Sequence, residues 1–93
     1  MTTVIWTQTA LDNYLSIIDY LFEHWTNKQI DKFEQNVEQV VCRIQHHNQI
    51  GKLSKILNYR KIIINKHISL IYALENNSIY LIAFLHNKSN HAF

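Results

Sequence analysis

The spacing of apolar residues changes once along this 93-residue chain, and that change restricts its possible folds more than any other feature. Between residues 11 and 44, apolar side chains recur at steps of three and four, which is the period of an amphipathic helix. From residue 56 onward, β-branched and aromatic residues run together, as is typical of strands. The pattern therefore predicts an α+β protein in which two helices precede most of the sheet.

The first helix is expected between Leu11 and Trp25, where the apolar stripe lies on one helical face. Thr9 is the expected N-cap, because a hydroxyl oxygen can accept a hydrogen bond from a free N–H of the first turn. Asp12 would then lie in that first turn, where the helix dipole favours a negative charge. The aromatic residues of this part of the chain are expected to pack in the core; they are Trp6, Tyr14, Phe22, Trp25 and Phe33.

A second helix is expected directly after the first. Thr26 and Gln29 have the spacing of a capping box, and the apolar stripe that follows them extends to Ile44. The short connection between the two segments predicts an antiparallel helical hairpin. Gly51 is expected to end the second helix in the left-handed conformation that glycine adopts readily.

The remaining segments read as strands. They are residues 3–7, 56–65, 67–75 and 78–86. Asn65-Lys66 and Asn76-Asn77 are expected to form tight turns between the last three strands, because asparagine tolerates a positive φ. The expected fold is a single domain over residues 1–93 with the order β-α-α-β-β-β, an antiparallel sheet covered on one face by the helical hairpin.

Composition excludes several classes of protein. One glycine and no proline exclude a collagen-like chain, a glycine-rich phosphate loop and a proline-rich linker. Cys42 is the only cysteine, so an internal disulfide and a cysteine-based zinc site are excluded; it is expected to be a buried, inert residue of a cytoplasmic protein. The apolar runs are too short to span a membrane. No cysteine or acidic cluster completes a metal site around the adjacent His46 and His47, so neither a metal nor a cofactor is expected.

Charge is distributed unequally between the two halves of the chain. Residues 1–44 contain six acidic and three basic side chains, whereas residues 45–93 contain six basic and one acidic. Five of the six histidines also lie in the second half. A basic half of this kind indicates either a surface for a polyanion or acidic protein, or ordinary scatter of surface charge.

Four segments, taken in order, carry a resemblance to a known family. They are Ile5–Ala10 (IWTQTA), Tyr59–Ile64 (YRKIII), Lys66–Tyr72 (KHISLIY) and Ile79–Lys88 (IYLIAFLHNK). Their order and spacing over almost the whole chain resemble the RelE/ParE superfamily of bacterial toxins from type II toxin–antitoxin pairs. The resemblance implies a cytoplasmic toxin with no membrane partner, neutralised by a cognate antitoxin with which it would form a hetero-oligomer.

The resemblance implies two different targets. RelE-like members are ribosome-dependent mRNA endonucleases that use basic, histidine and tyrosine side chains on the sheet and near the C-terminus. ParE-like members share the fold, largely lack those residues and poison DNA gyrase. Cleavage of ribosome-bound mRNA is the first hypothesis for this chain, and gyrase inhibition without nuclease chemistry is the alternative.

Candidate catalytic residues follow from the nuclease hypothesis. Cleavage by the adjacent 2′-hydroxyl needs a base, an acid and cations for the phosphorane charge, and it needs no metal. Arg60 matches the family's arginine and would hold a phosphate through two hydrogen bonds. His86 would act as acid or base, and Lys88 matches a basic residue of the family's C-terminal cluster. The expected RNA- and phosphate-binding residues are Lys52, Lys55, Lys61, Lys66, His67 and His91.

Two departures from the nuclease pattern favour the other interpretations. Ser69 stands in the middle strand where many active nucleases of the family have a basic residue, and no tyrosine follows Tyr80. Phe93 is aromatic but has no hydroxyl with which to transfer a proton. Besides gyrase inhibition, the open alternatives are a catalytically degenerate member that binds its antitoxin and an unrelated small RNA-binding domain.

Overall fold

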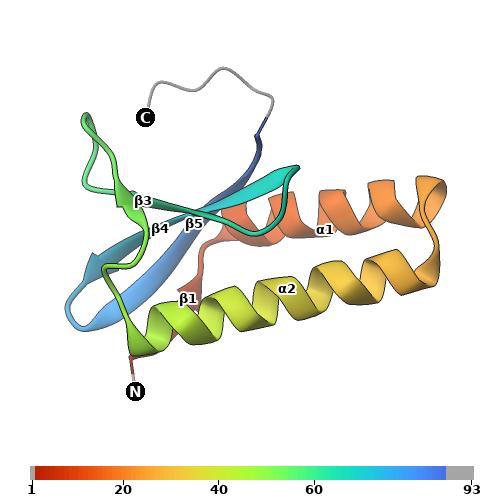
Figure 1. Cartoon of the computed structure of the whole chain (residues 1–93). Coiled ribbons are helices and arrows are strands. Elements are labelled where there is room, and N and C mark those ends of the chain that lie inside the picture. The colour runs from red at the N-terminus through yellow and green to blue at the C-terminus, as the bar shows by residue number, and fades with distance from the viewer. Residues whose placement is uncertain (1, 88–93) are drawn as a thin grey trace.

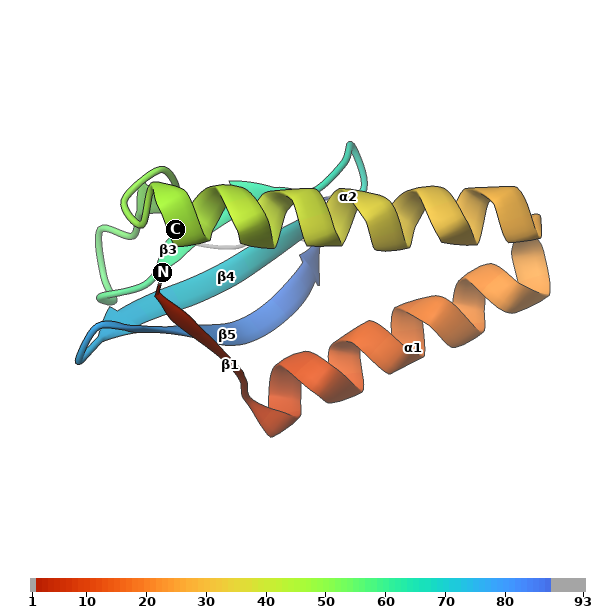
Figure 2. The same cartoon turned by 90° about the horizontal axis from the view of Figure 1, so that it is seen from below.

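A computed structural model describes residues 2–87 as two helices packed on one face of a sheet (Figure 1). The elements are β1 (Thr3–Trp6), α1 (Gln8–His24), α2 (Asn27–His46), β2 (Lys52–Leu53), β3 (Arg60–Ile63), β4 (Ile68–Glu75) and β5 (Ser78–His86). The view from below shows both helices on the same side of the strands (Figure 2). The predicted α+β class and the helical hairpin are therefore confirmed.

The five strands form one sheet in the order β1-β5-β4-β3-β2. β3, β4 and β5 make the predicted antiparallel meander, but β1 pairs in parallel with β5, from Thr3 opposite Ser78 to Trp6 opposite Leu81. The prediction of a wholly antiparallel sheet is wrong at this edge. A parallel neighbour needs a long crossover, and the helices and β2–β4 provide it, so the pairing depends on packing far along the chain.

The observed strand boundaries differ most from the predicted ones at β3. The predicted run 56–65 is reduced to Arg60–Ile63, because residues 54–59 form a loop, and the short β2 before that loop was not predicted. The Asn76-Asn77 turn is confirmed, with φ values of 51° and 62°. At the other turn, positive φ is not used. The side chain of Asn65 instead accepts hydrogen bonds from the backbone N–H groups of His67 and Ile68, at 2.8 and 2.9 Å.

Both helices begin with a threonine cap. The capping box of Thr26 and Gln29 is confirmed in both directions, at 3.3 and 3.1 Å. The first N-cap, however, is Thr7 and not Thr9. The Thr7 hydroxyl accepts from the Ala10 N–H at 3.2 Å and donates to the Leu81 carbonyl at 2.7 Å, so it joins the start of α1 to β5.

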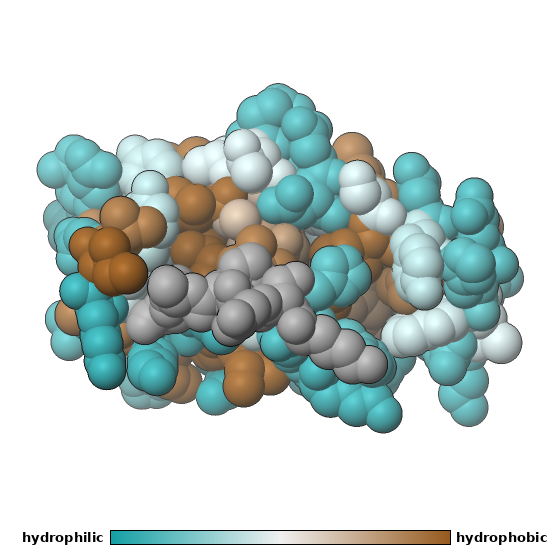
Figure 3. Space-filling model, turned by 90° about the horizontal axis from the view of Figure 1, so that it is seen from above, coloured by the Kyte–Doolittle hydropathy of each residue, from teal (hydrophilic) through white to brown (hydrophobic). Residues whose placement is uncertain are grey.

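The face of the sheet opposite the helices is visible in Figure 3. Apolar side chains are visible on this face, and hydrophilic side chains surround them. In the register, Lys61 lies between Lys52 of β2 and Ile71 of β4, and these positions share the face that turns away from the helices.

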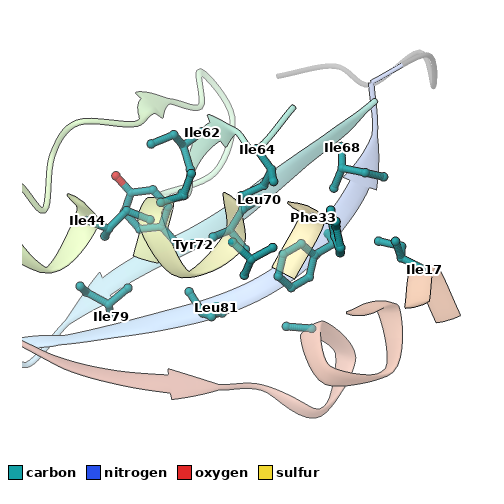
Figure 4. Packing of buried hydrophobic residues seen from close by; sticks show 14 of the residues in the cluster. Ile17, Phe33, Ile44, Ile62, Ile64, Ile68, Leu70, Tyr72, Ile79 and Leu81 are labelled. Carbon is teal, nitrogen blue, oxygen red and sulfur yellow. The ribbon is translucent and has the colours of Figure 1, made fainter. Parts of the chain in front are cut away.

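The core lies between the sheet and the helices (Figure 4). Ile62, Leu70, Tyr72, Ile79 and Leu81 of the sheet pack against residues of the helices. The buried helical residues are Ala10, Ile17, Leu21, Ile30, Phe33, Val37, Val40 and Ile44. Each large apolar side chain that is fully buried contributes roughly 1.5–3 kcal/mol, so this layer provides most of the stability.

Tyr14 joins four elements through its ring. It lies 5.3 Å from Trp6, 5.8 Å from Phe33 and 5.6 Å from Phe84, measured between ring centroids. Three aromatic residues expected in the core are exposed instead: Phe22 on α1 is 67% exposed, Trp6 is 39% exposed and Trp25 is 36% exposed. Cys42 is also exposed, contrary to the prediction, since it lies beside the apolar stripe of α2 and not on it.

Gly51 has a role that differs from the predicted helix cap. Its φ is not positive, and a Cβ atom at this position would lie 2.8 Å from both Cε1 and the hydroxyl oxygen of Tyr72. The Gly51 N–H donates to the Tyr72 hydroxyl at 2.8 Å, and that hydroxyl donates to the carbonyl of Asn48 at 2.8 Å. Glycine is therefore required by close approach to a buried ring and not by backbone conformation.

We expect Gly51→Ala to lower the free energy of unfolding by about 1–3 kcal/mol, because the added methyl group must displace Tyr72 or the backbone. Urea denaturation measures the change. Lys52→Ala is the matched control, since Lys52 is the exposed neighbour, and its effect should stay within about 0.5 kcal/mol. Equal stability of the two variants would show that the close contact carries no cost.

Tyr72 also predicts a dependence of stability on pH. Burial raises the pKa of its phenol, against smaller lowering effects of the Gly51 hydrogen bond and the Arg60 charge. Above about pH 10 the unfolded phenol loses its proton before the folded one does, so the free energy of unfolding falls as pH rises. Urea denaturation between pH about 8 and about 11 should show a smaller fall in Tyr72→Phe than in the wild type. Tyr20→Phe is the control, because Tyr20 is exposed on α1. Its free energy of unfolding should fall with pH as much as that of the wild type.

Candidate functional site

Arg60 is the first residue of β3, and its side chain bonds to the segment that connects α2 to β2. Its Nη1 atom donates to the carbonyls of Gln49 and Gly51, at 3.1 and 2.9 Å. Arg60 is also the cross-strand partner of Tyr72, so both belong to the face of the sheet that carries the core. A guanidinium has five N–H donors, and part of this set fixes the connection between α2 and β2.

Ser69 lies in the middle strand and is 1% exposed. Its hydroxyl donates to the side-chain oxygen of Asn87, whose side-chain nitrogen donates to the Asn65 carbonyl at 3.0 Å. The backbone N–H of Asn87 donates to the His67 carbonyl at 2.8 Å. Ser69 thus belongs to a polar network that joins the end of β5 to the turn before β4.

His86 lies on the helix side of the sheet. It pairs with Ile68 of β4, and both line a cavity of about 550 Å³ beside α1. His67 lines the same cavity, with its ring centroid 6.0 Å from that of Trp25. The remaining lining residues are Asn13, Ser16, Ile17, Tyr20, Leu21, Phe33, Asn65 and Phe84. The two imidazoles therefore border one mostly apolar cavity.

Arg60 and His86 do not meet. Their partners in β4 are Tyr72 and Ile68, which stand four residues apart, or about 13 Å along the strand. β3 and β5 also flank β4 on opposite sides, which adds about 10 Å across the sheet. One phosphate group is too small to bridge these two positions.

The lysines of the predicted phosphate-binding set are spread over the second half of the chain. Lys52 and Lys55 are exposed in β2 and the loop after it, Lys66 is exposed in the turn before β4, and Lys61 is partly exposed in β3. Lys88 and His91, which the sequence also nominated, lie outside the described residues.

Sequence reasoning missed the group formed by Gly51, Arg60 and Tyr72. The signal that could have found it is that the chain has one glycine, placed shortly before the Tyr-Arg pair of the second predicted strand. Over residues 2–87, no three metal-ligating side chains come together. No helix in that range is long and apolar enough to cross a membrane.

Solved structures resemble this chain in fold at low sequence identity. A chromosomal ParDE toxin–antitoxin system of P. aeruginosa matches with a TM-score of 0.77 and 17% identity, covering 92% of this chain and 96% of that one. A copper-bound mutant toxin from Helicobacter pylori has a TM-score of 0.68 and 11% identity, with coverages of 94% and 96%. A YoeB–YefM complex from Staphylococcus aureus has a TM-score of 0.60 and 20% identity, with coverages of 90% and 94%. At these identities the likeness shows a shared fold.

The family itself follows from the sequence. No curated protein matches the chain, but the family model described as the ParE toxin of the type II toxin–antitoxin system parDE matches residues 4–91. That match spans nearly all of the chain and covers the described helices and strands, apart from Thr3 at the start of β1. The chain therefore belongs to the ParE toxin family of type II toxin–antitoxin systems.

Proposed function

We propose that this toxin arrests growth by binding and inhibiting DNA gyrase, with no ribonuclease chemistry of its own, and that a cognate antitoxin neutralises it. The observation that carries the proposal is the state of Ser69. At the position where the resemblance to nucleases calls for a basic side chain, the chain has a buried hydroxyl that is already bonded to Asn87. A buried serine supplies no cation to a phosphorane.

The separation of Arg60 and His86 supports the same proposal. A cleavage site needs a cation and an acid or base within reach of one scissile phosphate. Arg60 is bonded to backbone carbonyls at one end of the sheet, whereas His86 lies at the far end beside α1. Inhibition by binding needs no such convergence, since it depends on surface complementarity alone.

Family membership supports the antitoxin as partner, and so do the toxin–antitoxin assemblies among the similar structures. The charge distribution is compatible with it, because the segment from residue 52 to 66 contains five basic and no acidic side chains. An acidic antitoxin segment would complement that charge.

Ribonuclease activity remains the second candidate, and one observation favours it. His67 and His86 border the same cavity, and two imidazoles that face one bound phosphodiester are able to act as base and acid. Lys66 precedes His67 and would supply a positive charge for phosphate.

Gyrase supercoiling of relaxed plasmid tests the proposal. We expect the purified wild-type toxin to inhibit supercoiling, and the His67→Gln/His86→Gln variant to inhibit equally, because binding does not use their proton chemistry. Primer extension on cellular mRNA after induction without antitoxin should show intact transcripts.

The opposite pattern would favour cleavage. Unimpaired supercoiling, together with cuts at defined codon positions that disappear in His67→Gln/His86→Gln, would replace gyrase inhibition with mRNA cleavage. The antitoxin serves as the control in both assays, since its addition should abolish whichever activity is present.

A further inference from the structure

The loop between β2 and β3 exposes apolar side chains at its tip. Ile56 is 70% exposed, more than any other large apolar residue over residues 2–87, and Leu57 is 55% exposed. Leu53, at the base of the loop, is 47% exposed. Single exposed apolar residues are ordinary, but three within five positions on one projecting loop form a patch. Hairpin loops are usually occupied by glycine, asparagine and other polar residues, so this composition needs a reason.

Hydrogen bonds within the loop fix its backbone conformation. The backbone N–H of Ser54 donates to the Tyr59 carbonyl at 2.8 Å and closes the hairpin. The Ser54 hydroxyl is buried and accepts from the N–H groups of Ile56 and Leu57, both at 3.1 Å. These bonds fix the backbone that presents both apolar side chains, which lowers the entropy lost when a partner binds them.

The loop projects from the sheet and not from the helices. It rises at the left end of Figure 1, on the side of the sheet that faces away from α1 and α2. Figure 3 looks down on the same side and shows an apolar projection at its left end, next to hydrophilic side chains. A partner therefore reaches the loop without displacing the helical layer.

The surroundings of the patch are cationic. Lys52 and Lys55 are exposed on either side of Leu53, and Arg60 follows at the start of β3. The sequence contains no acidic residue between Glu38 and Glu75. The complementary surface is therefore an apolar pocket with a carboxylate rim, in which apolar contact supplies affinity and charge supplies orientation and association rate.

We propose that the β2–β3 loop, together with Leu53 at the end of β2, is the element with which the toxin docks into an acidic, apolar-centred pocket of its protein target. The inference rests on the proposed function only in that the toxin acts by binding a protein. An RNA target fits the patch less well, because RNA binding uses phosphate contacts and stacking on aromatic or arginine planes, and neither isoleucine nor leucine provides them. Two inserted aliphatic side chains are also a weak anchor for a lipid surface, since even one long acyl chain binds a membrane only reversibly.

Two loop variants and one control test the proposal. Ile56→Asn/Leu57→Asn removes the apolar tip and keeps the charge, whereas Lys52→Gln/Lys55→Gln removes charge and keeps the tip. Phe22→Asn is the control, because Phe22 is equally exposed but lies on α1. Thermal melts identify any variant that fails to fold, and the milder Ile56→Thr replaces the double variant in that case.

Growth arrest after induction without antitoxin is the first measurement, and binding to purified gyrase is the second. We expect the apolar variant to lose arrest and to bind gyrase at least about tenfold more weakly, as for residues at the centre of an interface, while Phe22→Asn behaves like the wild type. The apolar variant should still form a complex with the purified antitoxin. Arrest by a wild-type toxin that does not bind gyrase would overturn the proposed function, and the loop would then be judged on growth arrest alone.

Several results would overturn the loop assignment. Arrest by the apolar variant equal to that of the wild type would remove the loop from the target contact. Loss of arrest in the charge variant only would indicate a polyanion such as RNA. Loss of antitoxin binding with arrest retained would assign the loop to the antitoxin. Sedimentation with vesicles of phosphatidylethanolamine and phosphatidylglycerol, abolished in the apolar variant, would assign it to a lipid surface.

Discussion

The buried hydroxyl of Tyr72 is the interaction on which the connection between the two layers depends. A phenol in the core must have hydrogen-bond partners, because an unpaired buried polar group costs about 1–3 kcal/mol. Asn48 and Gly51, which directly follow α2, provide one acceptor and one donor. The middle strand of the sheet thus fixes where the second helix ends and where the chain turns back into β2.

Arg60 is placed by the same arrangement. Its guanidinium bonds to the carbonyls on both sides of the turn, so the arginine that resembles a catalytic residue is also a structural one. At the other end of the sheet, the hydrogen bond between Ser69 and Asn87 likewise joins a strand to its neighbouring segment. Arg60 and Ser69 therefore both make hydrogen bonds that close the ends of the sheet. What is left for a partner is an apolar and cationic surface, which suits recognition better than proton transfer.

Local signals explain what the sequence predicted well. The capping box of Thr26 and Gln29 and the turn at Asn76-Asn77 depend on residues within three positions of each other, so the pattern contained them completely. The parallel pairing of β1 with β5 joins residues about 75 positions apart and left no local trace. The N-cap was predicted at Thr9 and lies at Thr7 for a similar reason. The Thr7 hydroxyl donates to a carbonyl of β5, a contact between distant segments that local spacing does not reveal.

The candidate site was less predictable than the fold. The resemblance identified Arg60 and His86 as candidate catalytic residues, but residue type does not show that their partners in β4 stand four residues apart. The loop at residues 54–59 was assigned in part to a strand, because Ile56 and Leu57 have strand propensity and only the hydrogen bonds of Ser54 reveal the turn. In both cases the missing information was the geometry of contacts between segments, which composition and spacing do not carry.

The charge distribution acquires a spatial meaning in the folded protein. Six of the seven acidic residues lie in α1 and α2, whereas the sheet and its loops carry most of the basic ones. The two layers are separated by the apolar core, and salt screens exposed charges from one another beyond about 8 Å at physiological ionic strength. The acidic layer therefore scarcely weakens the field around the β2–β3 loop. A partner bound to the helices would leave that field almost unchanged, so an antitoxin that blocks the loop must cover it directly or move it.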